Sequence, residues 1–149
     1  MLFDDSIVCS APPCPLQLLV WDTAGEELYR AMTKSFFKGA AGAIIVYDVT
    51  NAKSLSNIPG WVEDFRSHNP DGIIIVAGNK CDMPPEKHRV TEEDVDDIMA
   101  RMRPKIEADG GALVHMSVSA LTGEGVQGAF SSIALQLAER HLGLKPVGA

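Results

Sequence analysis

Apolar residues in this chain gather into short continuous runs, and the segments between the runs carry apolar residues at helical spacing. Four runs predict strands, at residues 16–21, 43–47, 73–77 and 113–118. The clearest of them are rich in Ile and Val throughout, which is typical of strands covered on both faces. The alternation of strands with helices predicts an α/β fold with a mainly parallel sheet.

Three helical stripes lie between or after these runs. The first consists of Leu55, Ile58, Trp61, Val62 and Phe65, and its early Pro59 and Gly60 predict a distorted first turn. In the second, Thr91 is the expected N-cap, with Asp94 three residues later as a capping-box partner. Pro104 is expected to end or kink this helix. The apolar stripe of this second helix consists of Val95, Ile98, Met99 and Met102. The third stripe consists of Val126, Ala129, Phe130, Ile133 and Leu137.

Length, charge and cysteine content narrow the class of protein. A chain of 149 residues suffices for one domain with its own core. Its formal net charge of -7 argues against non-specific binding to nucleic acid or to an anionic membrane surface. The three cysteines are irregularly spaced, so neither a disulfide framework nor a zinc site is predicted, and a reduced, cytosolic setting is expected.

Three polar loops follow predicted strands, and the carboxyl ends of parallel strands meet at one edge, where ligands bind. The loops are "DTAG" at 22–25, "NKCD" at 79–82 and "SAL" at 119–121. A carboxylate such as Asp22 can hold Mg²⁺ through a water, and Gly25 allows its N–H to approach a phosphate. Asp82 can accept paired hydrogen bonds from guanine, which adenine cannot offer. Taken alone, "DTAG" fits a plain strand-to-helix turn equally well, and "NKCD" fits an ordinary polar loop better. "SAL" is a weak signal by itself, because small residues are common after strands.

The order and spacing of the loops make a family resemblance specific. The stretches "LQLLVWDTAGEELYR", "KSFFKGAAGAIIVYDVTNAKSL", "GNKCD" and "SAL" resemble the Rab family of Ras-superfamily small GTPases. The similarity covers residues 16–138 and implies a P-loop GTPase-like three-layer fold. It also implies binding of GTP or GDP with Mg²⁺, and slow GTP hydrolysis.

The resemblance assigns roles at matching positions. Lys80 would pack on the guanine base that Asp82 reads, Asn79 would tie neighbouring loops, and Asp22 would stand near the Mg²⁺ water shell. Glu26 occupies the position of the family's catalytic Gln. Gly25 would donate its N–H to the γ-phosphate and Ala120 its N–H to the guanine oxygen, with Ser119 bracing the loop. The implied nucleotide-binding set is Asp22, Thr23, Ala24, Gly25, Asn79, Lys80, Asp82, Ser119, Ala120 and Leu121.

The chain departs from the family most strongly at its start. No Gly-Lys pair occurs, so the phosphate-binding pattern G-x-x-x-x-G-K-[ST] is absent from the sequence. Residues 1–15 precede the first run, whereas a strand, phosphate loop and helix need about 30 residues. We therefore expect the first strand, phosphate loop, first helix and switch I threonine to be missing, through either a genuine loss or an incomplete gene model.

In the family, the missing strand lies between the strands that correspond to residues 16–21 and 43–47, so both are expected to lose a neighbour. Residues 1–15 form a divergent segment that either pairs as a hairpin across Pro12 and Pro13, giving an edge strand, or places residues 6–10 in the central position. Residues 16–141 are expected to form the incomplete domain, and 142–149 a short tail.

Two substitutions in the expected site are predicted to weaken its function. Glu26 adds a negative charge beside the phosphates and should slow hydrolysis even in a complete protein. Leu121 replaces the family's Lys and should weaken contact with the base. The C-terminal stretch "GLKPVGA" carries no cysteine, so no direct membrane anchor is expected.

Two functions of different class follow. The first is a monomeric, cytoplasmic Rab-like switch in vesicle transport, impaired in nucleotide binding and hydrolysis, with effectors and exchange factors as partners that also bring it to vesicle membranes. The second is a nucleotide-independent interaction module. Its apolar face would comprise Leu28, Tyr29, Met32, Phe36 and Phe37, although we expect the two phenylalanines to pack on the sheet. A truncated chain without a stable fold is a third, weaker alternative.

Overall fold

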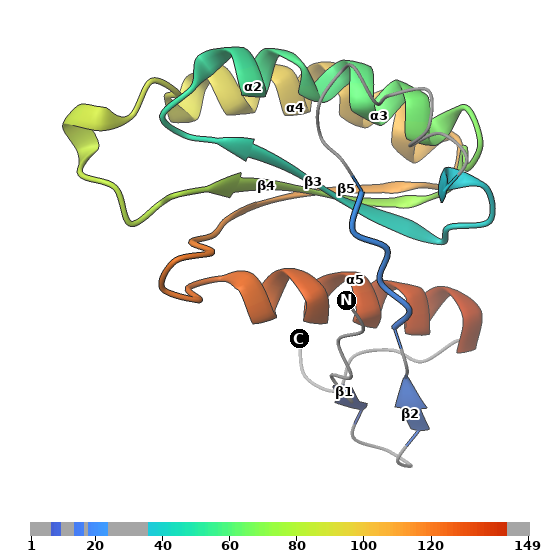
Figure 1. The fold of residues 1–149 in the computed structure, drawn as a ribbon. Helices are drawn as coiled ribbons and strands as arrows, with labels where there is room; N and C mark the ends of the chain where they lie inside the picture. Colours follow the sequence, from blue (N-terminus) through green and yellow to red (C-terminus); the bar gives the residue numbers. More distant parts are fainter. Residues whose placement is uncertain (1–6, 10–13, 17, 24–35, 143–149) are drawn as a thin grey trace.

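The centre of the protein is a three-stranded parallel sheet (Figure 1). The computed structural model describes residues 7–9, 14–16, 18–23 and 36–142. In the sheet, β3 (Gly42–Asp48) pairs with β4 (Ile73–Asn79), which pairs with β5 (Ala112–Ser117). These strands confirm the predictions at 43–47, 73–77 and 113–118, with each boundary within two residues.

Helices cover both faces of this sheet. On one face lie α2 (Ala52–Ser56), α3 (Ile58–Arg66) and α4 (Glu92–Ala108), and on the other lies α5 (Val126–Leu142), as Figure 1 shows. A short 3-10 turn, η2 (Pro85–Lys87), precedes α4. The result is the three-layer α/β arrangement that the sequence predicts.

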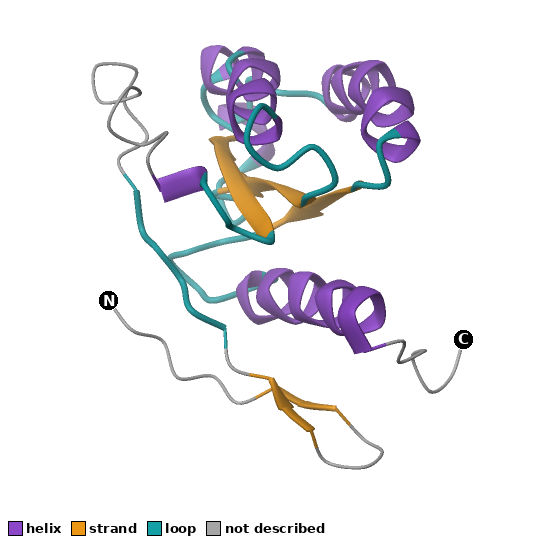
Figure 2. Cartoon of the chain, turned by 90° about the vertical axis from the view of Figure 1, so that its right-hand side faces the viewer, coloured by secondary structure: helices purple, strands orange, loops and turns teal. Residues whose placement is uncertain are grey.

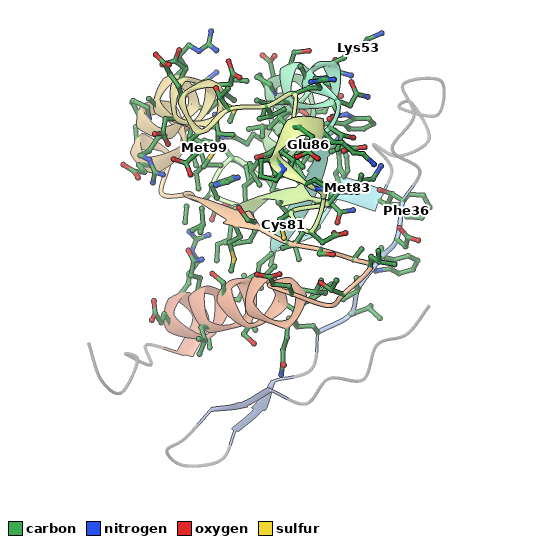
Figure 3. All side chains as sticks on the ribbon, turned by 90° about the vertical axis from the view of Figure 1, so that its left-hand side faces the viewer. Phe36, Lys53, Cys81, Met83, Glu86 and Met99 are labelled. Carbon is green, nitrogen blue, oxygen red and sulfur yellow. The ribbon has the colours of Figure 1, made fainter. Side chains whose placement is uncertain are left out.

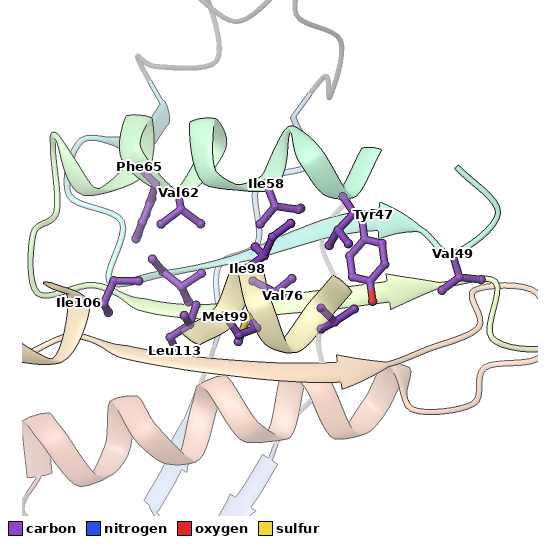
Figure 4. Close-up of a cluster of buried hydrophobic side chains, with 13 residues drawn as sticks. Tyr47, Val49, Ile58, Val62, Phe65, Val76, Ile98, Met99, Ile106 and Leu113 are labelled. Carbon is purple, nitrogen blue, oxygen red and sulfur yellow. The ribbon is translucent and has the colours of Figure 1, made fainter. Parts of the chain in front are cut away.

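Two apolar cores lie on the two sides of β4. Toward α3 and α4, Phe65, Ile74 and Ile106 are each at most 1% exposed. Figure 4 shows this cluster, with Phe65 and Ile106 labelled. Toward α5, Ile73 and Ile75 pack with the α5 residue Ile133. Because successive side chains of a strand point to opposite faces, a strand buried on both faces must be apolar throughout. This requirement explains the continuous Ile-rich run that forms β4.

The helix boundaries follow the local chemistry. The first stripe is divided at Asn57 into α2 and α3, and Pro59 lies in the first turn of α3. The capping box of α4 is confirmed, since Thr91 Oγ1 accepts from the Asp94 N–H and Asp94 Oδ2 accepts from the Thr91 N–H. Of the two effects expected of Pro104, an end or a kink, the end is wrong, because the helix continues to Ala108. Burial of Ile106 at 0% exposure stabilises the turn beyond the proline.

The strand predicted over 16–21 is wrong beyond Leu16. The strand β2 (Cys14–Leu16) pairs antiparallel with β1 (Ile7–Cys9) in a separate two-stranded sheet (Figure 2), and residues 18–23 form no strand. A strand needs a hydrogen-bonded neighbour, and none of the described strands pairs with residues 18–23. Leu19, at 66% exposure, and Trp21, at 63%, are not buried as residues of a covered strand would be.

The N-terminal segment forms the hairpin that we considered, but not as an edge of the main sheet. Ile7 lies opposite Leu16 and Cys9 opposite Cys14. Pro12 and Pro13 lie outside the described residues. The alternative in which this segment fills the central position of the sheet is wrong for Ile7–Cys9, which pair only within the hairpin sheet.

Within the described part of the chain, β3 pairs on one side only. Ile73 donates its N–H to Ala41, and Val49 donates its N–H to Asn79. In a parallel ladder, alternate residues face the neighbouring strand. The backbone groups of Gly42, Ile44 and Val46 therefore point to the outer edge of the sheet.

We expect Val46→Lys to reduce self-association at high protein concentration. Val46 is 55% exposed on this edge, and a lysine on an edge strand opposes pairing with another strand. Sedimentation velocity across a concentration series measures the effect. The control is Leu135→Lys, an exposed position on α5 that adds the same charge away from the edge. Equal effects of the two variants would contradict pairing through the β3 edge.

Candidate functional site

The loops after β4 and β5 interlock at the carboxyl-terminal edge of the sheet. Figure 3 looks onto this edge, where Cys81 lies just beyond β4. The side-chain oxygen of Asn79, the last residue of β4, accepts the N–H of Lys80 at 2.8 Å and that of Ala120 at 2.9 Å. One amide therefore joins the "NKCD" and "SAL" loops, an arrangement that sequence reasoning anticipated for Asn79.

A second connection between the loops runs through Ser119. Its hydroxyl donates to Asp82 Oδ1 at 2.5 Å and accepts the Thr122 N–H at 3.1 Å. Ser119 is 0% exposed, whereas Asp82 is exposed. The buried serine thus fixes one carboxylate oxygen of Asp82, and the other oxygen points to no described partner. Ser119 braces the loop, in the position that the resemblance implies.

Lys80 adopts a backbone conformation that is unusual for a residue with a side chain. Its φ is +70°, the only positive φ among the described non-glycine residues. Such backbone occurs where surrounding contacts determine it, and often at functional sites. The side-chain amine donates to Asp48 Oδ2 at 2.6 Å. That contact links the loop after β4 to the end of β3.

Asp48 is a site residue that sequence reasoning did not assign. Its Oδ1 accepts the Thr50 N–H at 2.8 Å and the Thr50 hydroxyl at 2.6 Å. Partial burial raises the pKa of Asp48, but hydrogen bonds from Lys80 and Thr50 outweigh that effect and lower it. The sequence signal that could have identified Asp48 is its place at the end of a predicted strand, because parallel strands end at the same edge as Asn79.

The residues that the resemblance assigns to the base include an exposed apolar side chain. Leu121 is 85% exposed, and Lys80 is exposed as well. An apolar side chain exposed beside polar loops offers surface to a flat ligand. In contrast, the Ala120 N–H that the resemblance assigns to the guanine oxygen already donates to Asn79. A ligand oxygen would have to share or replace that hydrogen bond.

The described half of the "DTAG" loop forms no bond with the other two loops. Asp22 and Thr23 are described, and no hydrogen bond or ion pair joins them to residues 79–82 or 119–121. Ala24, Gly25 and Glu26 lie outside the described residues. Nor do the described residues gather three or more His, Cys, Asp or Glu side chains around one point. A single exposed carboxylate, Asp22, does not by itself fit a Mg²⁺ ion.

The aromatic pair at 36–37 divides between core and surface. Phe37 packs against the core, with its ring 5.9 Å from that of Phe65, as expected. The same expectation for Phe36 is wrong, since it is 48% exposed and points outward (Figure 3). Its ring lies 5.8 Å from that of Trp21. Leu28, Tyr29 and Met32 lie outside the described residues.

Comparison with known proteins agrees with this geometry. A sequence model of the Ras family matches residues 7–139. The Ras-related protein Rab11A of Lotus japonicus is 35% identical over 119 residues, which cover 79% of this chain and 48% of that protein. The chain thus spans about half the length of this curated relative. No helix in the described ranges is long and apolar enough to cross a membrane. The parallel sheet, the interlocked loops and these matches together show that the chain belongs to the Ras family, as a Rab-type member of the Ras superfamily.

Proposed function

We propose that this chain is a Rab-like switch protein of vesicle transport that recognises the guanine base but holds the phosphates weakly. The observation that carries the proposal is the interlocking of the "NKCD" and "SAL" loops through Asn79 and Ser119. Ras and Rab proteins in general bind guanine nucleotide with Mg²⁺. The proposed nucleotide-binding domain spans residues 16–141, and its proposed partners are effectors and exchange factors.

The chemistry of Asp82 supports guanine as the preferred base. An ionised carboxylate only accepts hydrogen bonds, and guanine presents two adjacent donors, N1–H and the 2-amino group. Ser119 orients the carboxylate by its bond to Oδ1. Lys80 and Leu121 are exposed beside it, so that their side chains can cover the faces of a flat base.

The 149 residues of this chain supply few of the elements that hold the phosphates in GTPases. The sequence contains no G-x-x-x-x-G-K-[ST], whose backbone, Lys and Ser/Thr hold phosphates and Mg²⁺ in GTPases. A bound Mg²⁺ would neutralise phosphate charge, but Asp22 is a single exposed carboxylate and does not by itself fit the ion. Together with Glu26 at the catalytic Gln position, these features support impaired nucleotide binding and hydrolysis.

Calorimetric titration of the full chain with guanosine, GDP and ADP, with and without Mg²⁺, tests this function. Guanosine and GDP should bind with dissociation constants within about threefold of each other, because phosphate contacts contribute little. ADP should not bind, and Mg²⁺ should have no effect. Tight, Mg²⁺-dependent GDP binding would contradict the impaired phosphate side. Equal binding of GDP and ADP would overturn the base site.

We expect Asp82→Asn to reverse the base preference from guanosine toward xanthosine. An asparagine amide presents one donor and one acceptor, which matches N1–H beside the C2 carbonyl of xanthine. Guanosine affinity should fall about tenfold or more, since a lost charged hydrogen bond is worth about 1.5–3 kcal/mol. The control is Asp71→Asn, which removes an exposed carboxylate near Arg140. Unchanged selectivity in Asp82→Asn would contradict the assignment.

One observation favours the second function, a nucleotide-independent interaction module. Leu19, Trp21 and Phe36 are each at least 48% exposed, and the Trp21 and Phe36 rings lie 5.8 Å apart. Aromatic side chains exposed in this way are frequent at interfaces. Binding of a Rab effector domain that is equally strong with and without GDP, and is lost in Trp21→Ala, would support the module. Binding only in the presence of nucleotide would exclude it.

A further inference from the structure

We infer that Asp48 is a positioning residue that holds Lys80 in place at the guanine-binding edge. This inference rests on the proposed function, because it assigns a role within the same site. Asp48 is the last residue of β3, and the ladder register places it opposite Asn79, the last residue of β4. The end of β3 thus supplies the acceptor, Asp48. The adjacent end of β4 begins the loop that carries Lys80.

Every hydrogen-bonding group of Asp48 is engaged. Oδ1 accepts twice from Thr50, Oδ2 accepts from Lys80 at 2.6 Å, and the backbone N–H donates to the Ser54 hydroxyl at 2.9 Å. Its carboxylate therefore has one orientation, set from within β3 and the following turn. A fixed acceptor can hold a flexible lysine in a single rotamer, which an acceptor that rotates freely cannot do.

Lys80 requires such a partner for two reasons. Its backbone is in the left-handed region, at φ +70°, which L residues adopt only when neighbouring contacts favour it. Its side chain also has four methylenes, and their rotamer freedom is lost when the stem lies across a base. Asn79 fixes the Lys80 N–H at one end, and Asp48 fixes the amine at the other. The stem between them is thereby presented in one conformation before a ligand arrives.

The pair is partly exposed, which sets the size of its effect. The side chain of Lys80 is 50% exposed and that of Asp48 is 27% exposed. Ion pairs in such surroundings contribute only modestly, because water screens them. Asp48→Asn should therefore weaken guanosine binding by about two- to fivefold, through the positioning of Lys80 rather than through contact with the base.

The test combines a nucleotide-free readout with a double-mutant cycle. In the ligand-free protein, NMR should show that Asp48→Asn shifts the Lys80 backbone and side-chain amine resonances and changes the three-bond coupling that reports φ. Asp71→Asn, which loses an equivalent charge beside Arg140, should leave Lys80 unchanged. For guanosine, Asp48→Asn and Lys80→Met should be non-additive, with the double variant binding no more weakly than Lys80→Met.

The outcomes separate the inference from the proposed function. If the wild type binds no guanosine, the proposed function fails, and the positioning role for guanine fails with it. If the wild type binds guanosine but Asp48→Asn leaves Lys80 unchanged, or if its effect adds fully to that of Lys80→Met, the positioning role alone is overturned. Should Asp48→Asn not fold, Thr50→Val serves instead, because it removes one of the hydrogen bonds that orient Asp48. Its effect should be smaller and of the same sign.

Discussion

Replacing Gly125 with alanine is expected to lower the free energy of unfolding by roughly 2–5 kcal/mol. Gly125 has φ +69°, and a Cβ there would lie 2.3 Å from the backbone carbonyl oxygen of Ser117. That oxygen belongs to the last residue of β5 and cannot move aside as a side chain would. Alanine thus adds a steric clash to the strain of a left-handed backbone.

The same change should weaken guanosine binding, because the loop that Gly125 closes carries the site. Glu124, its neighbour, accepts the Ser119 N–H at 2.8 Å. Moving this carbonyl displaces Ser119, and with it the bond to Asp82. Urea unfolding followed by circular dichroism measures the stability, and calorimetry measures the binding.

Gly123→Ala is the matched control for this prediction. Gly123 also has a positive φ, of +85°, but a Cβ there would meet no atom within 4 Å. Its substitution carries the backbone strain alone, about 1 kcal/mol. Equal losses of stability in the two variants would show that the contact with Ser117 contributes nothing.

Stability at alkaline pH should depend on Tyr47. This side chain is 3% exposed, and burial raises its pKa from 10.0 to about 12. The unfolded chain releases the phenolic proton near pH 10, whereas the folded protein retains it until about pH 12. The stabilisation is therefore fully present below pH 10 and is lost as the pH rises through about 12. Two pKa units correspond to roughly 3 kcal/mol.

The Tyr47→Phe variant isolates this effect. It keeps the ring, which lies over Gly78 of β4, and removes only the hydroxyl that bonds His115 Nε2 at 3.0 Å. We expect Tyr47→Phe to be less stable near neutral pH by about 1 kcal/mol, but to lose less stability than the wild type between pH 10 and 12. Urea midpoints measured across this range test the difference. Parallel losses in both proteins would contradict the buried titration of Tyr47.

The pKa of His115 affects how the free energy of unfolding changes at acidic pH. Burial lowers its pKa below the usual 6.5, and the charge of Asp96 opposes that effect only in part. The fold therefore favours the neutral ring, so the unfolded chain binds more protons just below pH 6.5. Stability should fall as the pH drops through that range, in the wild type and in Tyr47→Phe alike.

Sequence patterns alone determined the elements that depend on the residues within the element itself. The Ile-rich run of β4 identifies a strand buried on both faces, because only a fully apolar strand can be covered twice. Thr91 and Asp94 locate the start of α4, because a capping box forms within four consecutive residues. The order of the polar loops placed Asn79, Asp82 and Ser119 at one edge, because parallel strands end together.

Features that depend on contacts between segments far apart in the sequence were decided only by the tertiary structure. The apolar run after Leu16 satisfies the pattern of a strand, yet residues 18–23 form none, because strand formation requires a partner that sequence pattern does not reveal. Pro104 interrupts a local hydrogen bond, but the buried Ile106 keeps the helix in place beyond it. Asp48 lies 32 residues from Lys80 along the chain, and only the register of β3 with β4 brings the two together.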